Sequence, residues 1–325
     1  EDEDEDEDEH DEHDEHEGLD QRDDHLVDAR LHEARAEAAF PPQGQFVQVD
    51  GHRVHALTMG DGPDVVLIHG ASGNLRDMTH SLAPRLADRY RVTVFDRPGL
   101  GYTDRINQSG ATIRQQAELL SDAARQLGIE KPVVLGHSYG GAVALAWAVH
   151  RPNHIAALVP LSAPAKPWDS PLSTYFKILS HPVAGPLVIP FLTAFVSDDR
   201  VEREVASIFN PNSVPQGYIS HVGAPLTLRR HSLRANALQR ANLLSEITAL
   251  HGAYDSLDIP VEIVHGTADT TVGLSIHAEP LSDQAPGANL TRLPGVGHMP
   301  QHVAQDPVVA AIDRAAQRAG LHPAP

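Results

Sequence analysis

From residue 45 onward, short apolar runs alternate with segments of helical periodicity. Helical patterns occupy 75–89, 111–127, 139–150 and 307–319. Apolar runs separated by helices are joined by crossovers and therefore form parallel strands. Two further runs, 46–50 and 53–59, flank Gly51 and predict an antiparallel hairpin. The predicted class is α/β, with an eight-stranded, mostly parallel sheet flanked by helices. Its remaining strands are DVVLIH (64–69), RVTVF (91–95), PVVLG (132–136), IAALVPL (155–161), VEIVHG (261–266) and NLTRLP (289–294).

Residues 165–245 break this rhythm. They supply no strand pattern and instead give apolar pieces punctuated by proline, followed by a polar helical piece. The interval is too long for a plain loop, so we expect a helical cap inserted after the sixth strand. Phe176, Phe191 and Phe195 are its candidate substrate-binding residues, although a cap packed on its own core would show the same residues.

The negative charge is concentrated at one end of the chain. Residues 1–24 contain 17 Asp and Glu against the single Arg22, and so carry −16 of the formal charge of −19. Such a segment repels itself and has little apolar surface to bury, so we expect a disordered tail, which looks artificial. A linker helix is expected within 25–44. The α/β core would occupy 45–164 and 246–325, on either side of the cap.

Composition narrows the possible partners and says little about the compartment. No basic stripe favours nucleic acid, and no window of 18 uncharged apolar residues predicts a membrane span. The absence of cysteine excludes disulfides and a cysteine nucleophile. The chain does not begin with methionine, which leaves open a missing signal or membrane anchor.

The segment Gly136-His137-Ser138-Tyr139-Gly140 lies where a buried strand meets a helix. Glycines on both sides permit a sharp turn, which pushes the serine side chain out at the carboxyl end of the sheet. The helix that follows starts with free N–H groups whose positive end favours an oxyanion. Serine alone is a weak nucleophile and needs a base, which in turn needs an orienting group.

Two later loops offer these groups. Asp269 follows the strand at 261–266, and His298 lies in the glycine-flanked loop GVGHMP after the last strand. Asp258 is the substitute acid, although it precedes its strand. His302 lies one helical turn beyond His298 and is expected on a surface.

With these motifs in hand, residues 45–320 resemble the α/β-hydrolase superfamily of serine hydrolases with a GHSxGG nucleophile elbow. LIHGASGN (67–74) resembles its oxyanion loop, and DRPGLGYTD (96–104) resembles its turn after the fourth strand. The resemblance implies Ser138, Asp269 and His298 as catalytic triad, with the N–H groups of Ala71 and Tyr139 as oxyanion hole.

The leading prediction is hydrolysis of a small, apolar carboxylic ester through an acyl-enzyme, with no metal and no organic cofactor. Lactonases, carbon–carbon bond hydrolases and cofactor-free perhydrolases use the same triad and remain alternatives. A non-catalytic binding module is the alternative of another class, and membrane association of the natural form is a further one. His69 and His137 are expected to hold loops, whereas Asn74 and Arg97 are open between substrate and backbone contacts.

Overall fold

The computed structural model describes residues 11–321, with side chains from residue 25 onward except that of Asp198. Eight strands form one sheet in the order β1-β2-β4-β3-β5-β6-β7-β8, which confirms the predicted fold class. β1 pairs antiparallel with β2 and β2 with β4, whereas the remaining pairs are parallel. The strands are β1 Gln45–Val49, β2 His52–Met59, β3 Asp64–Ile68, β4 Arg91–Phe95, β5 Val133–His137, β6 Ala157–Leu161, β7 Glu262–Gly266 and β8 Asn289–Leu293.

Alternate residues of the central strands serve two separate hydrophobic cores. In β3, Val66 and Ile68 pack with α4 (Ile113–Gln126), α5 (Tyr139–His150) and α11 (Ala278–Gln284). Val65 and Leu67 point to the opposite face, towards α2 (Arg76–Thr79), α3 (Leu82–Leu86) and α13 (Gln305–Arg318). Because successive side chains of a strand point to opposite faces, a strand covered on both sides is apolar throughout.

The helix expected over 75–89 is two short helices, α2 and α3, with a break between them. Ser81 has φ −153° and ends the helical run. Pro84 explains why one helix cannot continue, since proline has no N–H and its ring clashes with the carbonyl of residue 80.

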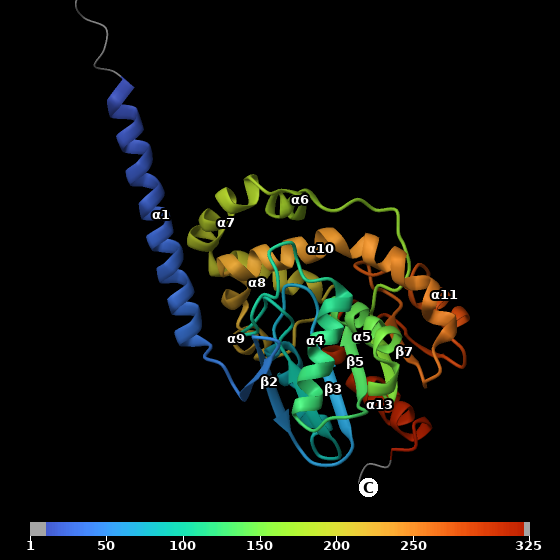
Figure 1. Ribbon diagram of the computed structural model, residues 1–325. Coiled ribbons are helices and arrows are strands. Elements are labelled where there is room, and N and C mark those ends of the chain that lie inside the picture. The colour runs from blue at the N-terminus through green and yellow to red at the C-terminus, as the bar shows by residue number, and fades with distance from the viewer. Residues whose placement is uncertain (1–10, 322–325) are drawn as a thin grey trace, which may run out of the picture.

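Every element in the expected cap interval is helical. It contains α6 Thr174–Ser180, α7 Ala184–Phe195, α8 Asp198–Ile208, α9 Tyr218–Val222, the 3-10 helix η2 Ala224–Leu228 and the long α10 Arg230–Leu250. These helices gather at one end of the sheet (Figure 1). Helix α10 runs past the expected boundary at 245, and its buried Leu243 and Ile247 join the core of the sheet. The last cap helix is thus shared between cap and core.

The N-terminal helix α1 runs from Asp11 to Ala39 and projects beyond the body of the protein (Figure 1). Residues 11–24 were expected to be disordered and are helical instead, while residues 1–10 lie outside the described residues. The C-terminal half of α1 is already helical, so extending the helix to residues 11–24 requires no new nucleation. Acidic side chains near the N-terminus of a helix also stabilise it.

The second half of α1 is packed against the cap rather than free as a linker. The His25 ring lies 4.4 Å from the Phe191 ring of α7. Glu33 and Glu37, one helical turn apart, pair with Arg230 at 2.8 Å and Arg229 at 2.9 Å. These contacts tie α1 to the start of α10.

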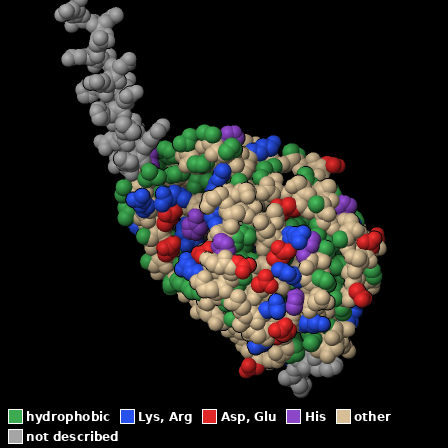
Figure 2. Space-filling view, viewed as in Figure 1, with side chains coloured by type: hydrophobic (Ala, Val, Ile, Leu, Met, Phe, Trp, Pro, Cys, Tyr) green, Lys and Arg blue, Asp and Glu red, His purple; other side chains and the backbone are tan. Residues whose placement is uncertain are grey.

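The outer side of α6 and α7 is apolar. Hydrophobic side chains gather there beside α1 (Figure 2). Within the described residues no single helix is long and apolar enough to cross a membrane, and α6 and α7 reach that limit only together, across a bend of 112°. Membrane association stays a prediction. The most exposed large hydrophobic residues of this surface are Tyr175, Val183, Leu187, Phe191 and Phe195.

Candidate active site

Ser138 sits on a strained turn between β5 and α5. Its backbone has φ 52° and ψ −122°, in a region that residues other than glycine rarely adopt. A Cβ at Gly136 would lie 2.1 Å from the carbonyl oxygen of Gly140, and one at Gly140 would lie 2.3 Å from that of Ile68. Both glycines are therefore required by close backbone approach, as the sequence pattern predicted.

The structure brings Ser138, His298 and Asp269 into one chain of hydrogen bonds. The distance from Ser138 Oγ to His298 Nε2 is 2.9 Å. His298 Nδ1 lies 2.7 Å from Asp269 Oδ2. Both ring nitrogens of His298 are thus engaged, one on the serine and one on the carboxylate. The substitute acid Asp258 is exposed and comes before β7, whereas Asp269 follows it.

Asp269 is held as a carboxylate. Its Oδ1 accepts the backbone N–H groups of Thr271 at 2.8 Å and Val272 at 2.9 Å. Burial acts to raise the pKa of Asp269, but hydrogen bonds from His265 and His298 outweigh burial and lower this pKa well below its ordinary value. The group therefore keeps its negative charge across the neutral range and can stabilise a positive charge on His298.

His137 and His69 hold loops, as expected from the sequence. His137 Nε2 donates to the carbonyl oxygen of His298 at 2.7 Å, and burial lowers the pKa of His137 to about 3. His69 Nδ1 donates to the carbonyl of Gly70 at 2.9 Å, and its Nε2 accepts the backbone N–H of Arg97 at 3.0 Å. Burial, reinforced by the charge of Arg97, lowers the pKa of His69 to about 4. Both histidines are neutral at neutral pH.

The glycine loop after β3 lies directly against the serine. A Cβ on Gly70 would lie 3.2 Å from Ser138 Cβ. Among the hydrogen bonds between described residues, none uses the backbone N–H of Ala71 or of Tyr139. Each is adjacent in sequence to a residue at this contact. Both N–H groups are thus without an acceptor among the described residues, and their role as oxyanion hole stays a prediction.

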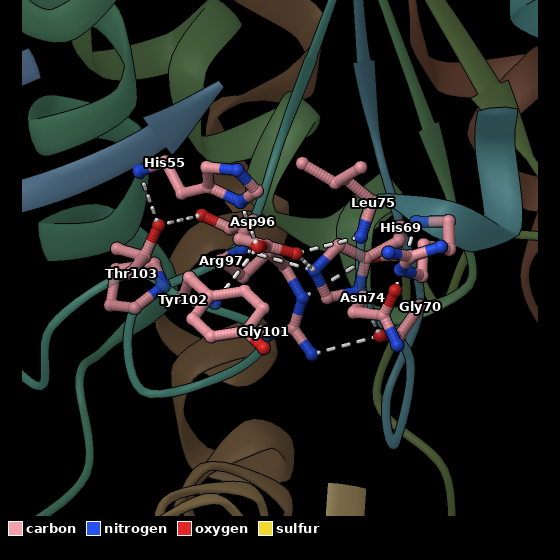
Figure 3. A network of polar contacts seen from close by, with 12 residues as sticks. His55, His69, Gly70, Asn74, Leu75, Asp96, Arg97, Gly101, Tyr102 and Thr103 are labelled. Atoms are coloured by element: carbon pink, nitrogen blue, oxygen red, sulfur yellow. Dashed lines mark hydrogen bonds and ion pairs between the residues drawn. The ribbon is translucent and has the colours of Figure 1, made fainter. Parts of the chain in front are cut away.

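Arg97 and Asn74 both pair with backbone groups, which is one of the two interpretations that the sequence left open. The Asn74 amide donates to the carbonyl of Val222 in the cap at 2.9 Å. Arg97 is fully buried and donates from Nε to the His69 carbonyl and from Nη2 to the Gly70 carbonyl, both at 3.0 Å. Figure 3 shows Arg97 beside the loop and Asp96 bound to His55 and to the backbone of Leu75 and Tyr102.

The three cap phenylalanines occupy different environments. Phe176 is partly buried against Leu179 and Leu233, with the Arg240 guanidinium 5.4 Å from its ring centre. Phe191 and Phe195 are 47% and 58% exposed, and both rings face His25 of α1. The expectation that these two line a substrate pocket is therefore corrected, because α7 turns this face towards α1 and solvent.

His302 is also corrected, since it is not a surface residue. Its ring is buried and contacts Asp77 at 2.9 Å, and Tyr218 of the cap donates to the same carboxylate at 2.7 Å. Burial acts to raise the pKa of Asp77, but the nearby His302 lowers it. Helix α12 (Pro300–Val303), which follows His298, is thereby fastened to both core and cap.

Sequence reasoning did not identify three further residues near the site. His265 is buried in β7, 3.4 Å from Asp269 Oδ2, and a lone histidine in an apolar strand was the available signal. Asn236 and Gln239 are buried on α10 and contact the two loops beside Ser138. Nothing local marks them, because α10 is polar along much of its length. Among the described side chains, no group of three or more His, Asp or Glu is arranged to hold a metal ion.

Comparisons with known proteins agree with this architecture. A family model described as alpha/beta hydrolase fold matches residues 63–305. An uncharacterised protein of Mycobacterium tuberculosis is 27% identical over 274 residues, covering 81% of this chain and 77% of that protein. An alpha/beta hydrolase fold protein from Burkholderia ambifaria has a TM-score of 0.68 at 24% identity, covering 83% of this chain and 96% of that one. A thermophilic esterase from Thermogutta terrifontis has a TM-score of 0.66 at 22% identity, covering 85% and 99%.

Proposed function

Because the chain belongs to the alpha/beta hydrolase fold family, we propose that it is a serine hydrolase that cleaves a carboxylic ester through an acyl-enzyme. The observation that carries the proposal is the continuous hydrogen-bond chain from Ser138 through His298 to Asp269. A base bonded to the nucleophile and oriented by a buried carboxylate is the arrangement that activates serine.

The first half-reaction moves one proton and exchanges one bond. His298 Nε2 accepts the proton of Ser138 as Oγ attacks the acyl carbon, and the ester carbonyl oxygen becomes an oxyanion. When the tetrahedral intermediate collapses, His298 gives this proton to the departing alcohol oxygen. The acyl group then remains on Ser138. In the second half-reaction His298 deprotonates water, which attacks the acyl carbon. When this second tetrahedral intermediate collapses, the bond to Ser138 Oγ breaks, His298 returns the proton to Oγ, and the acid and the free serine are released.

The N–H groups of Ala71 and Tyr139 are the proposed donors to the oxyanion. They are free of protein acceptors within the described hydrogen bonds, and Tyr139 begins helix α5, whose positive end favours negative charge. Removing one such donor costs about 3 kcal/mol of transition-state stabilisation in comparable sites.

Phe176 is the cap residue that we propose to contact an apolar acyl or alcohol group. The Arg240 guanidinium lies 5.4 Å from its ring centre, and the neighbouring Gln239 carbonyl accepts from the hydroxyl of Tyr139, the residue after Ser138, at 3.4 Å. These contacts support the proposal that this part of the cap lies near the nucleophile. The proposed substrate is therefore an ester with an apolar group.

A substrate panel with matched serine variants tests the proposal. Wild-type protein should hydrolyse p-nitrophenyl esters, and Ser138→Ala should lose at least about a thousandfold in rate while remaining folded. Ser121→Ala removes another buried serine hydroxyl, on α4, and should leave the rate unchanged. A fluorophosphonate probe should label Ser138 alone. Turnover of lactones or of a diketone without turnover of any ester would overturn the ester assignment.

A further inference from the structure

The glycine loop that carries Ala71 is held from the cap as well as from the core. Asn236 of α10 accepts the backbone N–H of Ser72 through Oδ1 and donates to Ser72 Oγ through Nδ2, both at 2.9 Å. Thr227 of η2 donates to the Ser72 carbonyl oxygen at 2.9 Å. Ser72 has φ 55°, so the loop adopts a conformation that needs such support.

A second connection from α10 reaches the same loop through Arg97. Gln239 accepts from Arg97 Nη1 at 2.8 Å through Oε1 and donates to the Pro98 carbonyl at 2.8 Å. Gln239 lies three residues after Asn236, and residues at this spacing share one helix face. Both side chains are almost fully buried, with exposed fractions of 3% for Asn236 and 1% for Gln239. One face of α10 thus contacts both the glycine loop and the Arg97 guanidinium, which donates to that loop.

Arg97 determines the direction of the Ala71 N–H. The Gly70 carbonyl and the Ala71 N–H belong to one planar trans peptide, so they point in opposite directions. Because Arg97 Nη2 and His69 Nδ1 both donate to that carbonyl, they aim the Ala71 N–H away from Arg97. The same guanidinium lies 4.2 Å from the ring centre of Tyr139, whose N–H is the other proposed donor.

We propose that Asn236 and Gln239 are positioning residues through which the cap helix α10 sets the geometry of the oxyanion hole. This inference rests on the proposed function and deepens it. It makes the cap an element of the chemical step as well as of substrate selection. A shift of α10 changes the direction of the Ala71 N–H, so changes in the contacts between the cap and this loop change kcat.

Two variants with similar side-chain size test the inference. Asn236→Leu removes both hydrogen bonds to Ser72, and Gln239→Met removes the acceptor for Arg97. Each is expected to lower kcat on p-nitrophenyl acetate about 10- to 100-fold, with KM changed by less than about threefold, since a misaimed donor acts on the transition state. The affinity for butylboronic acid, which forms a tetrahedral anion on the serine, should fall by the same factor.

A matched control and a rescue separate positioning from folding. Asn242→Leu removes a hydrogen bond from the same helix to the Ser109 carbonyl, outside the hole, and should leave kcat within about twofold. Asn236→Asp keeps acceptors for both the N–H and the hydroxyl of Ser72 and should restore most of kcat. If the two main variants do not fold, Thr227→Val carries the test, with kcat lowered several-fold and KM unchanged.

The outcomes are distinguishable from failure of the proposed function. If wild-type protein hydrolyses no ester and Ser138 is not labelled, the proposed function is wrong. If wild-type protein is active but Asn236→Leu and Gln239→Met have the same kcat as the control Asn242→Leu, the inference alone is wrong. It is equally wrong if the two variants have fewer active sites, as counted by active-site titration, but an unchanged kcat per active site.

Discussion

Replacing Asp269 by asparagine should disable His298 without disturbing the loop around it. Two backbone N–H groups, from Thr271 and Val272, converge on Oδ1 and would hold the oxygen of the new amide in that place. Turning the amide round would leave both N–H groups unpaired, at about 1–3 kcal/mol for a buried donor such as that of Val272. The amide NH₂ must therefore face His298 Nδ1.

This orientation selects the wrong tautomer of His298. With an N–H donor opposite Nδ1, the ring must accept there and carry its proton on Nε2, the atom that lies 2.9 Å from Ser138 Oγ. The base can then no longer accept the serine proton. Such a tautomer change lowers kcat about 10,000-fold in serine hydrolase triads, which corresponds to about 5 kcal/mol.

The assay is kcat/KM on p-nitrophenyl acetate at pH 7.5, with thermal unfolding as a check on the fold. Asp258→Asn is the matched control, since Asp258 is exposed and should give wild-type kinetics. Retention of more than about a tenth of wild-type kcat/KM in Asp269→Asn would refute the reasoning. A comparable loss in Asp258→Asn would transfer the role to that residue.

Deleting residues 1–24 should leave kcat/KM on a soluble short ester unchanged, because Glu33 and Glu37, which tie α1 to the cap, remain; a tenfold loss would contradict this. Burial raises the pKa of Glu246 from 4.5 to about 7, so the folded state binds more protons than the unfolded state between those values, and this contribution to stability falls as pH rises through them. Glu246→Gln should remove this loss of stability, which is at most about 3 kcal/mol in the free energy of unfolding and less because Glu246 is partly exposed. Urea unfolding at pH 4 and pH 8 measures it, and equal pH dependence in both proteins would rule out the role of Glu246. Phe176→Ala should lower kcat/KM on long esters more than on the acetate, whereas Phe191→Ala should affect both equally. If both variants changed the chain-length preference in the same way, Phe176 would not be a specific substrate contact.

Local patterns in the sequence were sufficient for the sheet and for the turn that carries Ser138. Alternation of apolar runs with helical segments reflects burial on two faces, which each strand experiences independently of the others. The glycines at 136 and 140 are required by close contacts within the elbow and with the preceding strand, and that requirement is visible in the motif itself. Asp269 and His298 were candidates because of the positions of their loops after two strands, and their assignment as a triad with Ser138 came from the resemblance to a known family.

The tertiary structure decided which way each helix faces and which distant groups meet. Phe191 and Phe195 have the composition of a pocket lining, but the packing of α1 on α7 gives them another environment. Asn236 reaches Ser72 across 164 residues, and Gln239 reaches Arg97 across 142. A polar side chain on a long helix carries no local mark of its partner. The partner is determined by how the helix docks, and docking depends on the summed packing of the whole cap and sheet.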